Sequence, residues 1–303
     1  MCKRLMVHLL LVLANLPLPC QADYCADGHW LELGRELGYT GEQDGMTGPS
    51  NCKVLPDDPT RAVIALTRPV VAEGTADRTN DVDVYRLDLL IVNTGTGDVI
   101  SRWSDAKYIV SDAFRFAFID IDTAAYRLAP GVRAFGFATR RSTNSHVIDG
   151  QDRVLTLFVA TGQTIRPVLR NLIILQRFAD AVTGDVLPPR LIGYAWCGDR
   201  TAGDGPDARS GTRGARTPIK DAEYSARERR TTIQIGTRAH QGFADLVLRT
   251  TAIEGETRLY EPTAANDCIA EVTTTRTSHQ RYVLRYNGVE YVVPRPLLHE
   301  LDD

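Results

Sequence analysis

The chain of 303 residues has no apolar run long enough to cross a bilayer as a helix, since a spanning helix needs roughly 20 apolar residues. The run at residues 5–13 is much shorter. The residues around it are Lys3 and Arg4 on its basic N-terminal side, and Pro17, Pro19 and Ala22 after it. This pattern predicts a secretory signal peptide over residues 1–22 and a mature chain that begins at Asp23. An uncleaved anchor is disfavoured by the short run, and lipid attachment at Cys20 is disfavoured because Pro19 precedes it.

Cysteine is scarce: the chain has 6, and none lies in a Cys-x-x-Cys pair. The cysteines that remain after removal of the predicted signal peptide are Cys25, Cys52, Cys197 and Cys268. In an oxidising compartment they predict disulfides, and every pairing among them is open. We favour Cys25–Cys52 with Cys197–Cys268, because each bond closes a loop within one half of the chain. A zinc site is disfavoured, since His240 and His279 have no ligand-like spacing to the cysteines. No metal is expected.

A large excess of charge of one sign is also absent. Lys and Arg number 35 and Asp and Glu number 38, for a net charge of −3 at pH 7. Residues 1–22 carry two basic side chains and no acidic ones, so their removal changes the net charge from −3 to −5. This mild value argues against nucleic acid or an anionic membrane as the main partner. No membrane span is expected after cleavage of the signal peptide.

Signatures of catalytic and nucleotide-binding sites are missing. No Gly-x-Ser-x-Gly sequence marks a hydrolase nucleophile. The glycine pair within residues 93–98 lacks the lysine and helix of a phosphate loop, so it predicts a hairpin turn. Asp120 and Asp122 lie two positions apart at a strand end and point to one side. With a histidine such as His146, they support an alternative function as a cell-envelope hydrolase with paired carboxylates. No cofactor is expected.

What the sequence does contain is a series of short apolar or alternating segments separated by Gly, Pro and Asn. They predict strands at residues 61–67, 82–92, 99–103, 114–120, 132–138, 154–159, 165–169, 172–178, 191–196, 230–235, 243–248, 269–273, 282–286 and 290–293. No long helices alternate with them, which disfavours a parallel α/β sheet. The prediction is therefore an all-β, antiparallel fold, either propeller-like or a sandwich, over residues 61–303.

Two segments depart from this pattern. Residues 23–60 are rich in Gly, Asp and Pro and hold one short helical candidate, residues 29–37. They predict an N-terminal strap, pinned by a disulfide between Cys25 and Cys52. Residues 198–226 have few apolar side chains to bury and predict a mobile loop.

Tyrosine and arginine gather near the C-terminus, around the hairpin predicted at Asn287-Gly288. The candidate binding residues there are Tyr282, Arg285, Tyr286 and Tyr291. Tyrosine and arginine often anchor protein–protein contacts, which favours a contact surface. Ordinary cross-strand pairing on a sheet face is the alternative interpretation.

Residues 242–248, with the order Gly-aromatic-x-Asp-Leu, precede residues 281–294, in which Tyr286 and Tyr291 flank the hairpin turn at Asn287-Gly288. This unit resembles the blade-like repeats of propeller-like periplasmic bacterial β-proteins. The resemblance covers residues 229–294 and does not extend to residues 60–196. Some proteins of that kind inhibit peptidoglycan hydrolases or act as immunity proteins against secreted toxins. The resemblance therefore implies a binding role, although a shared fold does not by itself establish a shared function.

Together these observations predict an exported, non-catalytic binding protein of the periplasm or the extracellular space. Its expected partner is a protein of the cell envelope, such as a cell-wall hydrolase or a secreted toxin that it inhibits. The hydrolase that uses Asp120 and Asp122 is the alternative. A structural envelope component is a third hypothesis, which self-association would support.

Overall fold

The structure of the chain is a computed structural model. It describes residues 24–38, 50–70, 83–111, 114–143, 148–181, 218–260 and 270–299. The predicted signal peptide, His146 and the cysteines Cys197 and Cys268 lie outside the described residues. So do residues 191–196, where a strand was expected, and residues 198–217 of the expected loop.

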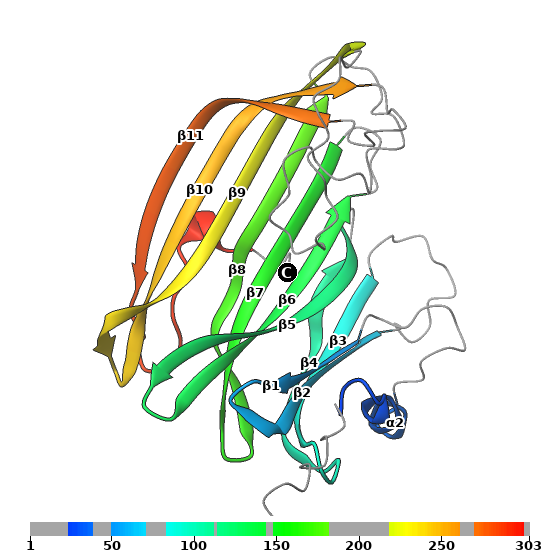
Figure 1. The fold of residues 1–303 in the computed structure, drawn as a ribbon, viewed down its shortest axis with the longest axis vertical. Helices are drawn as coiled ribbons and strands as arrows, with labels where there is room; N and C mark the ends of the chain where they lie inside the picture. Colours follow the sequence, from blue (N-terminus) through cyan, green and yellow to red (C-terminus); the bar gives the residue numbers. More distant parts are fainter. Residues whose placement is uncertain are drawn as a thin grey trace, which may run out of the picture.

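Strands dominate the described chain, as Figure 1 shows. The strands are β1 (Asn51–Leu55), β2 (Asp58–Pro69), β3 (Asp83–Asn93), β4 (Val99–Ser111), β5 (Phe114–Ala129), β6 (Val132–Thr143), β7 (Ile148–Thr161), β8 (Thr164–Ala181), β9 (Pro218–His240), β10 (Phe243–Tyr260) and β11 (Ala270–Leu284). The helix α2 (His29–Glu36) precedes them, and the 3-10 turn η1 (Arg295–Leu297) follows them. The prediction of an all-β fold is confirmed, whereas a propeller-like arrangement is not.

These strands form one open sheet of 11 strands. Its order runs β1-β2-β3-β4-β8-β7-β6-β5, and β9, β10 and β11 continue from β8. Neighbouring strands are antiparallel except β4 and β8, which pair in parallel at Arg102 and Thr164. The sheet is therefore mixed, and the prediction of antiparallel pairing holds for all its other neighbours.

Strand β8 joins the two parts of the sheet. One edge of β8 pairs with β7 from Thr164 to Asp180. The opposite edge pairs with β4 at Thr164 and with β9 from Leu175 onward. Between these two strands it bonds to residues 285–299, which we call the C-terminal segment, through bridges at Leu169 and Leu172. Four different parts of the chain thus meet on one strand.

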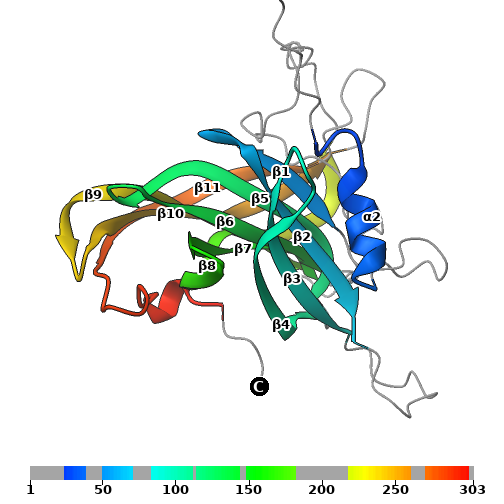
Figure 2. The same ribbon diagram turned by 90° about the horizontal axis from the view of Figure 1, so that it is seen from below.

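Apolar side chains fill both faces of the β5–β8 region, because β6 and β7 are buried for most of their length. One face packs against β1–β4, which lie to one side of it in Figure 2. That contact includes Val63, Leu87, Leu89, Tyr108, Phe137 and Phe158. The other face packs against β10, β11 and the C-terminal segment, through Leu155, Leu169, Leu246, Leu284, Tyr291 and Leu297.

The N-terminal strap covers the outer face of β2 and β3. Tyr24 is buried there beside Ile64 and Leu90, and partly buried apolar residues of α2 pack on the same cluster. The indole of Trp30 donates to the carbonyl of Cys25 over 3.1 Å. The disulfide between Cys25 and Cys52 ties this segment to β1. A disulfide-pinned strap with one short helix is therefore confirmed, whereas β1 within it was missed.

Strand β8 corrects the prediction of two strands at residues 165–169 and 172–178. It is one strand of 18 residues with a bulge, in which the register against β7 shifts. Asn171 lies in this bulge at φ 55°, and its N–H donates to the hydroxyl of Thr156 over 3.2 Å. Asparagine tolerates this left-handed conformation better than most residues. The polar residues that resembled a turn thus bend the strand without ending it.

Strand β11 also replaces two predicted strands, at residues 269–273 and 282–286. The intervening residues 274–281 are polar and so carry no apolar signal, but all of them except Thr275, where the register shifts, pair with β10. Strand β9 begins at Pro218, within the segment 198–226 predicted as a loop. Residues 290–293 form no strand. Before them, the side chain of Asn287 accepts hydrogen bonds from the N–H groups of Val289 and Glu290, each 2.8 Å long, and so closes a tight turn.

Replacing Cys25 and Cys52 together with serine tests the strap. The bond closes a loop with a sequence separation of 27. Its loss frees the unfolded chain and lowers the free energy of unfolding by about 3–4 kcal/mol. Urea denaturation followed by tryptophan fluorescence measures this change. An unchanged free energy of unfolding would contradict a stabilising role for the bond.

Candidate functional site

The two carboxylates proposed for catalysis are held in structural contacts. Asp120 forms an ion pair with Arg153 of β7. Asp122 accepts a hydrogen bond of 2.7 Å from the hydroxyl of Tyr126 and one of 2.8 Å from the N–H of Ala124. Burial, together with the adjacent Asp122 carboxylate, raises the pKa of Tyr126, so its hydroxyl stays protonated and donates. Asp122 therefore stabilises the register shift in β5 at this point.

A second polar cluster lies between β6, β7 and the C-terminal segment. The guanidinium of Arg141 donates to Asp152 from Nε over 3.1 Å and from Nη2 over 2.5 Å. Both residues are buried. The Nη2 atom also lies 3.2 Å from Nδ1 of His299. This ion pair is neutral overall and attaches the end of the C-terminal segment to β6.

A cavity of about 20 Å³ adjoins this cluster. It is lined by Tyr108, Ile109, Val110, Thr139, Arg141, Val154, Asn171 and His299. Burial raises the pKa of Tyr108, whose hydroxyl donates to Thr156 over 2.6 Å. A space of this size holds about one water molecule. The cluster is thus an internal polar contact, and the cavity beside it is too small to hold a substrate.

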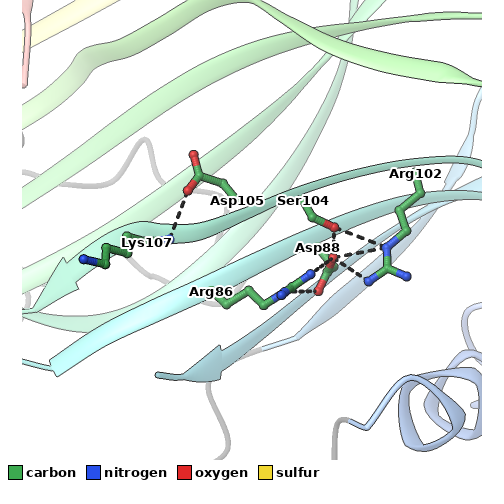
Figure 3. A network of polar contacts seen from close by, with 6 residues as sticks. All are labelled: Arg86, Asp88, Arg102, Ser104, Asp105 and Lys107. Carbon is green, nitrogen blue, oxygen red and sulfur yellow. Dashed lines mark hydrogen bonds and ion pairs between the residues drawn. The ribbon is translucent and has the colours of Figure 1, made fainter. Parts of the chain in front are cut away.

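Asp88 of β3 forms the third cluster, shown in Figure 3. Its side chain is 1% exposed and lies between two arginines. Arg86 Nε and Arg102 Nη2 each approach it to 2.9 Å, and the hydroxyl of Ser104 donates to it as well. Asp105, on the same strand as Ser104, accepts instead from the N–H of Lys107 over 3.0 Å. The arginines compensate the buried charge of Asp88 and join β3 to β4.

The four candidate binding residues near the C-terminus separate into core and surface. Tyr286 is 4% exposed and Tyr291 is 1% exposed. The ring of Tyr286 lies 4.5 Å from that of Phe243 and 5.2 Å from that of Tyr291. Tyr282 is half-buried, and Arg285 is exposed. The structure therefore places Tyr286 and Tyr291, both in the C-terminal segment, in the core.

The edge of β11 is the feature that the sequence did not indicate. β11 pairs with β10 from Leu284 to Ala270, and no other strand in the described part of the chain pairs with it. It is the outermost strand in Figure 1. Its polar middle gave no signal of burial, and a free edge depends on the order of strands, which periodicity does not reveal.

Basic side chains lie along this edge. Arg281 of β11 is directly opposite Arg249 of β10, and Thr232 of β9 lies beyond Arg249. All three side chains are exposed. His279, two positions along β11 on the same face, contacts the hydroxyl of Thr251 over 3.2 Å. Residues 276–285 contain no acidic side chain. The edge is therefore a basic strand whose outer main-chain groups pair with no other described strand.

Comparison with known proteins identifies no relative: no family model, no curated protein and no solved structure matches this chain. Among the described residues no helix combines the length and apolarity needed to span a membrane. The same residues hold no group of three or more His, Cys, Asp and Glu side chains arranged for a metal ion. His240, considered above as a zinc ligand, instead pairs with Asp245, whose Oδ1 lies 2.5 Å from its Nδ1.

Replacing Asp88 with asparagine tests the third cluster. The neutral amide accepts the arginine hydrogen bonds less well, and the two cations lose their counter-charge. We expect the free energy of unfolding to fall by about 1–3 kcal/mol in chemical denaturation. Asp27→Asn, at an exposed position, is the matched control and should change it by less than about 0.5 kcal/mol. Equal effects of the two substitutions would contradict the assigned role.

Tyr291→Ala and Arg285→Ala separate core from surface among the predicted binding residues. Removing the buried ring leaves a cavity, so we expect a loss of about 3–5 kcal/mol for Tyr291→Ala. Arg285→Ala should change stability by less than about 0.5 kcal/mol, because its side chain is exposed. Thermal unfolding followed by circular dichroism measures both. A comparable loss for the two variants would argue against this division.

Proposed function

We propose that the chain is an exported, non-catalytic binding protein, acting on a protein of the cell envelope or on a secreted toxin. The observation that carries the proposal is the free edge of β11, which is 15 residues long. An exposed edge presents unpaired N–H and C=O groups that bind a further strand. Proteins usually block such edges with proline, bulges or covering loops. β11 contains no proline, and its register against β10 is regular from Leu284 to Arg276, with one shift beyond Arg276, at Thr275.

Export is part of the same proposal. The predicted signal peptide at residues 1–22 supports it, and the disulfide between Cys25 and Cys52 is compatible with an oxidising compartment. The periplasm or the extracellular space is therefore the proposed location. A partner in either place would meet the chain after it has folded.

An inhibitory or immunity role is the form of binding that we favour. Such a protein needs a rigid surface and no reacting groups, and its edge strand can add to a strand of the target. The geometry does not favour the alternative hydrolase. Asp120 is paired with Arg153, and Asp122 is bonded to Tyr126. Neither carboxylate lines the cavity beside Arg141.

Affinity capture with the full chain as bait, from envelope extract and culture fluid, tests the proposal. We expect mass spectrometry to identify one stoichiometric partner, a cell-wall hydrolase or a toxin. Addition of the purified chain should then lower the activity of that partner by about tenfold at saturation. The control bait is an unrelated exported β-protein of similar charge.

A captured enzyme whose activity is unaffected by the chain would contradict the inhibitory role. Capture of the same proteins by both baits would contradict a specific binding function. Turnover of peptidoglycan fragments by the chain alone, lost in Asp120→Asn, would instead establish the hydrolase.

A further inference from the structure

We propose that the β11 edge binds an extended, acidic polypeptide segment as an additional strand of the sheet. The inference rests on the proposed function and names the site and the class of partner. The main chain of β11 supplies half of the recognition. One of its edges is occupied by β10, and the alternate N–H and C=O groups of the other edge point away from the sheet. A bound segment would complete these hydrogen bonds whatever its sequence.

Side-chain charge supplies the selectivity. Arg281 and Arg249 lie directly opposite each other across the β10–β11 pair. Like charges in directly opposite positions destabilise a sheet. A carboxylate on an added strand, opposite Arg281, would be next to one cation and diagonal to His279, and would relieve this repulsion. No acid between residues 276 and 285 already does so.

An acid further along this face, Glu228, is already bound. Glu228 of β9 forms an ion pair with Arg177, whose Nε lies 2.9 Å from its Oε2, and a second ion pair with Arg230. It lies opposite Ile253, two positions further along β10 than the residue that pairs with His279. The positive charge of the Arg281–Arg249 pair is therefore not balanced by Glu228.

The strand period defines the expected ligand pattern. Arg281 and His279 lie on one face of β11, and so does Val283, which is 43% exposed. An added strand that matches them carries acidic side chains at two alternate positions and an apolar side chain at the next alternate position. The residues between them face Tyr282 and Gln280, whose side chains bond to each other on the opposite side. The partner is thus an extended peptide with spaced acids, in contrast to a flexible polyanion recognised by charge alone.

The test uses synthetic peptides and the full chain. The probe is a fluorescent ten-residue peptide that alternates Glu and Thr and carries Val at one end in place of the last Glu. A second peptide has two Thr replaced by Pro, which keeps the charge and removes strand pairing. A third has Lys in place of Glu. Fluorescence anisotropy measures the dissociation constant of each.

We expect the first peptide to bind at least about tenfold more tightly than the other two. Arg281→Glu should weaken its binding by about tenfold or more and should allow the Lys peptide to bind. Arg115→Glu is the matched control, since Arg115 is an exposed arginine of β5 remote from this edge, and it should leave binding unchanged. Hydrogen exchange should show new protection of β11 amides in the complex with the first peptide.

Equal binding of the proline peptide would overturn the inference, because it would show recognition of charge without strand pairing. An unaltered dissociation constant in Arg281→Glu would overturn it as well. If no peptide binds and the chain still captures and inhibits an envelope protein, the edge is the wrong site and the proposed function stands. If the peptide binds as expected and no protein is captured or inhibited, the inhibitory function fails and the edge remains a peptide site.

Discussion

The pairing of β8 with four neighbours is the constraint on which the rest of the fold depends. β7 occupies one edge of β8, while β4, the C-terminal segment and β9 follow one another along the other edge. The bulge at Asn171 lies between the two bridges to the C-terminal segment, at Leu169 and Leu172. Because of this division, β1–β4 and β9–β11 extend from the same strand, and each packs on a different face of β5–β8. A sheet built in this way stays open and ends in β11.

Buried carboxylates in this protein are used to hold strands together. Asp88 lies between two arginines, Asp152 binds Arg141, and Asp245 pairs with a histidine. Removing one partner of such a pair leaves an uncompensated charge in a medium of low polarity, which is costly. Acids in these places are therefore fixed to one geometry. The same use of charge explains why the carboxylates that invited a catalytic interpretation have partners of their own.

Most of the strands in the core, the helix and the Cys25–Cys52 bond were predictable because each leaves a local mark. The apolar residues at 132–138 mark a buried strand, and the short separation of Cys25 and Cys52 favours a bond within one half of the chain. The continuity of β11 through residues 274–281 was not predictable, because that stretch is polar and edge pairing needs no apolar pattern. Nor was the burial of Tyr291, since it depends on the C-terminal segment returning to β8 from β11. The order of the strands in the sheet, and the pairing of the C-terminal segment with a strand far back in the sequence, are properties of the topology. The periodicity of a single sequence does not reveal them.

The position of the C-terminal segment has a consequence for the timing of folding. Tyr291 and Leu298 pair with Leu169 and Leu172 in the middle of β8, although β9, β10 and β11 lie between them in the sequence. Until they pair, the central strand has an incomplete edge, and Leu246 and Leu284 lack part of their cover. Contacts of such large sequence separation form late, because loop closure must come first. Completion of the core thus waits for contacts between parts of the chain that are far apart in sequence, whatever the order in which the other strands pair.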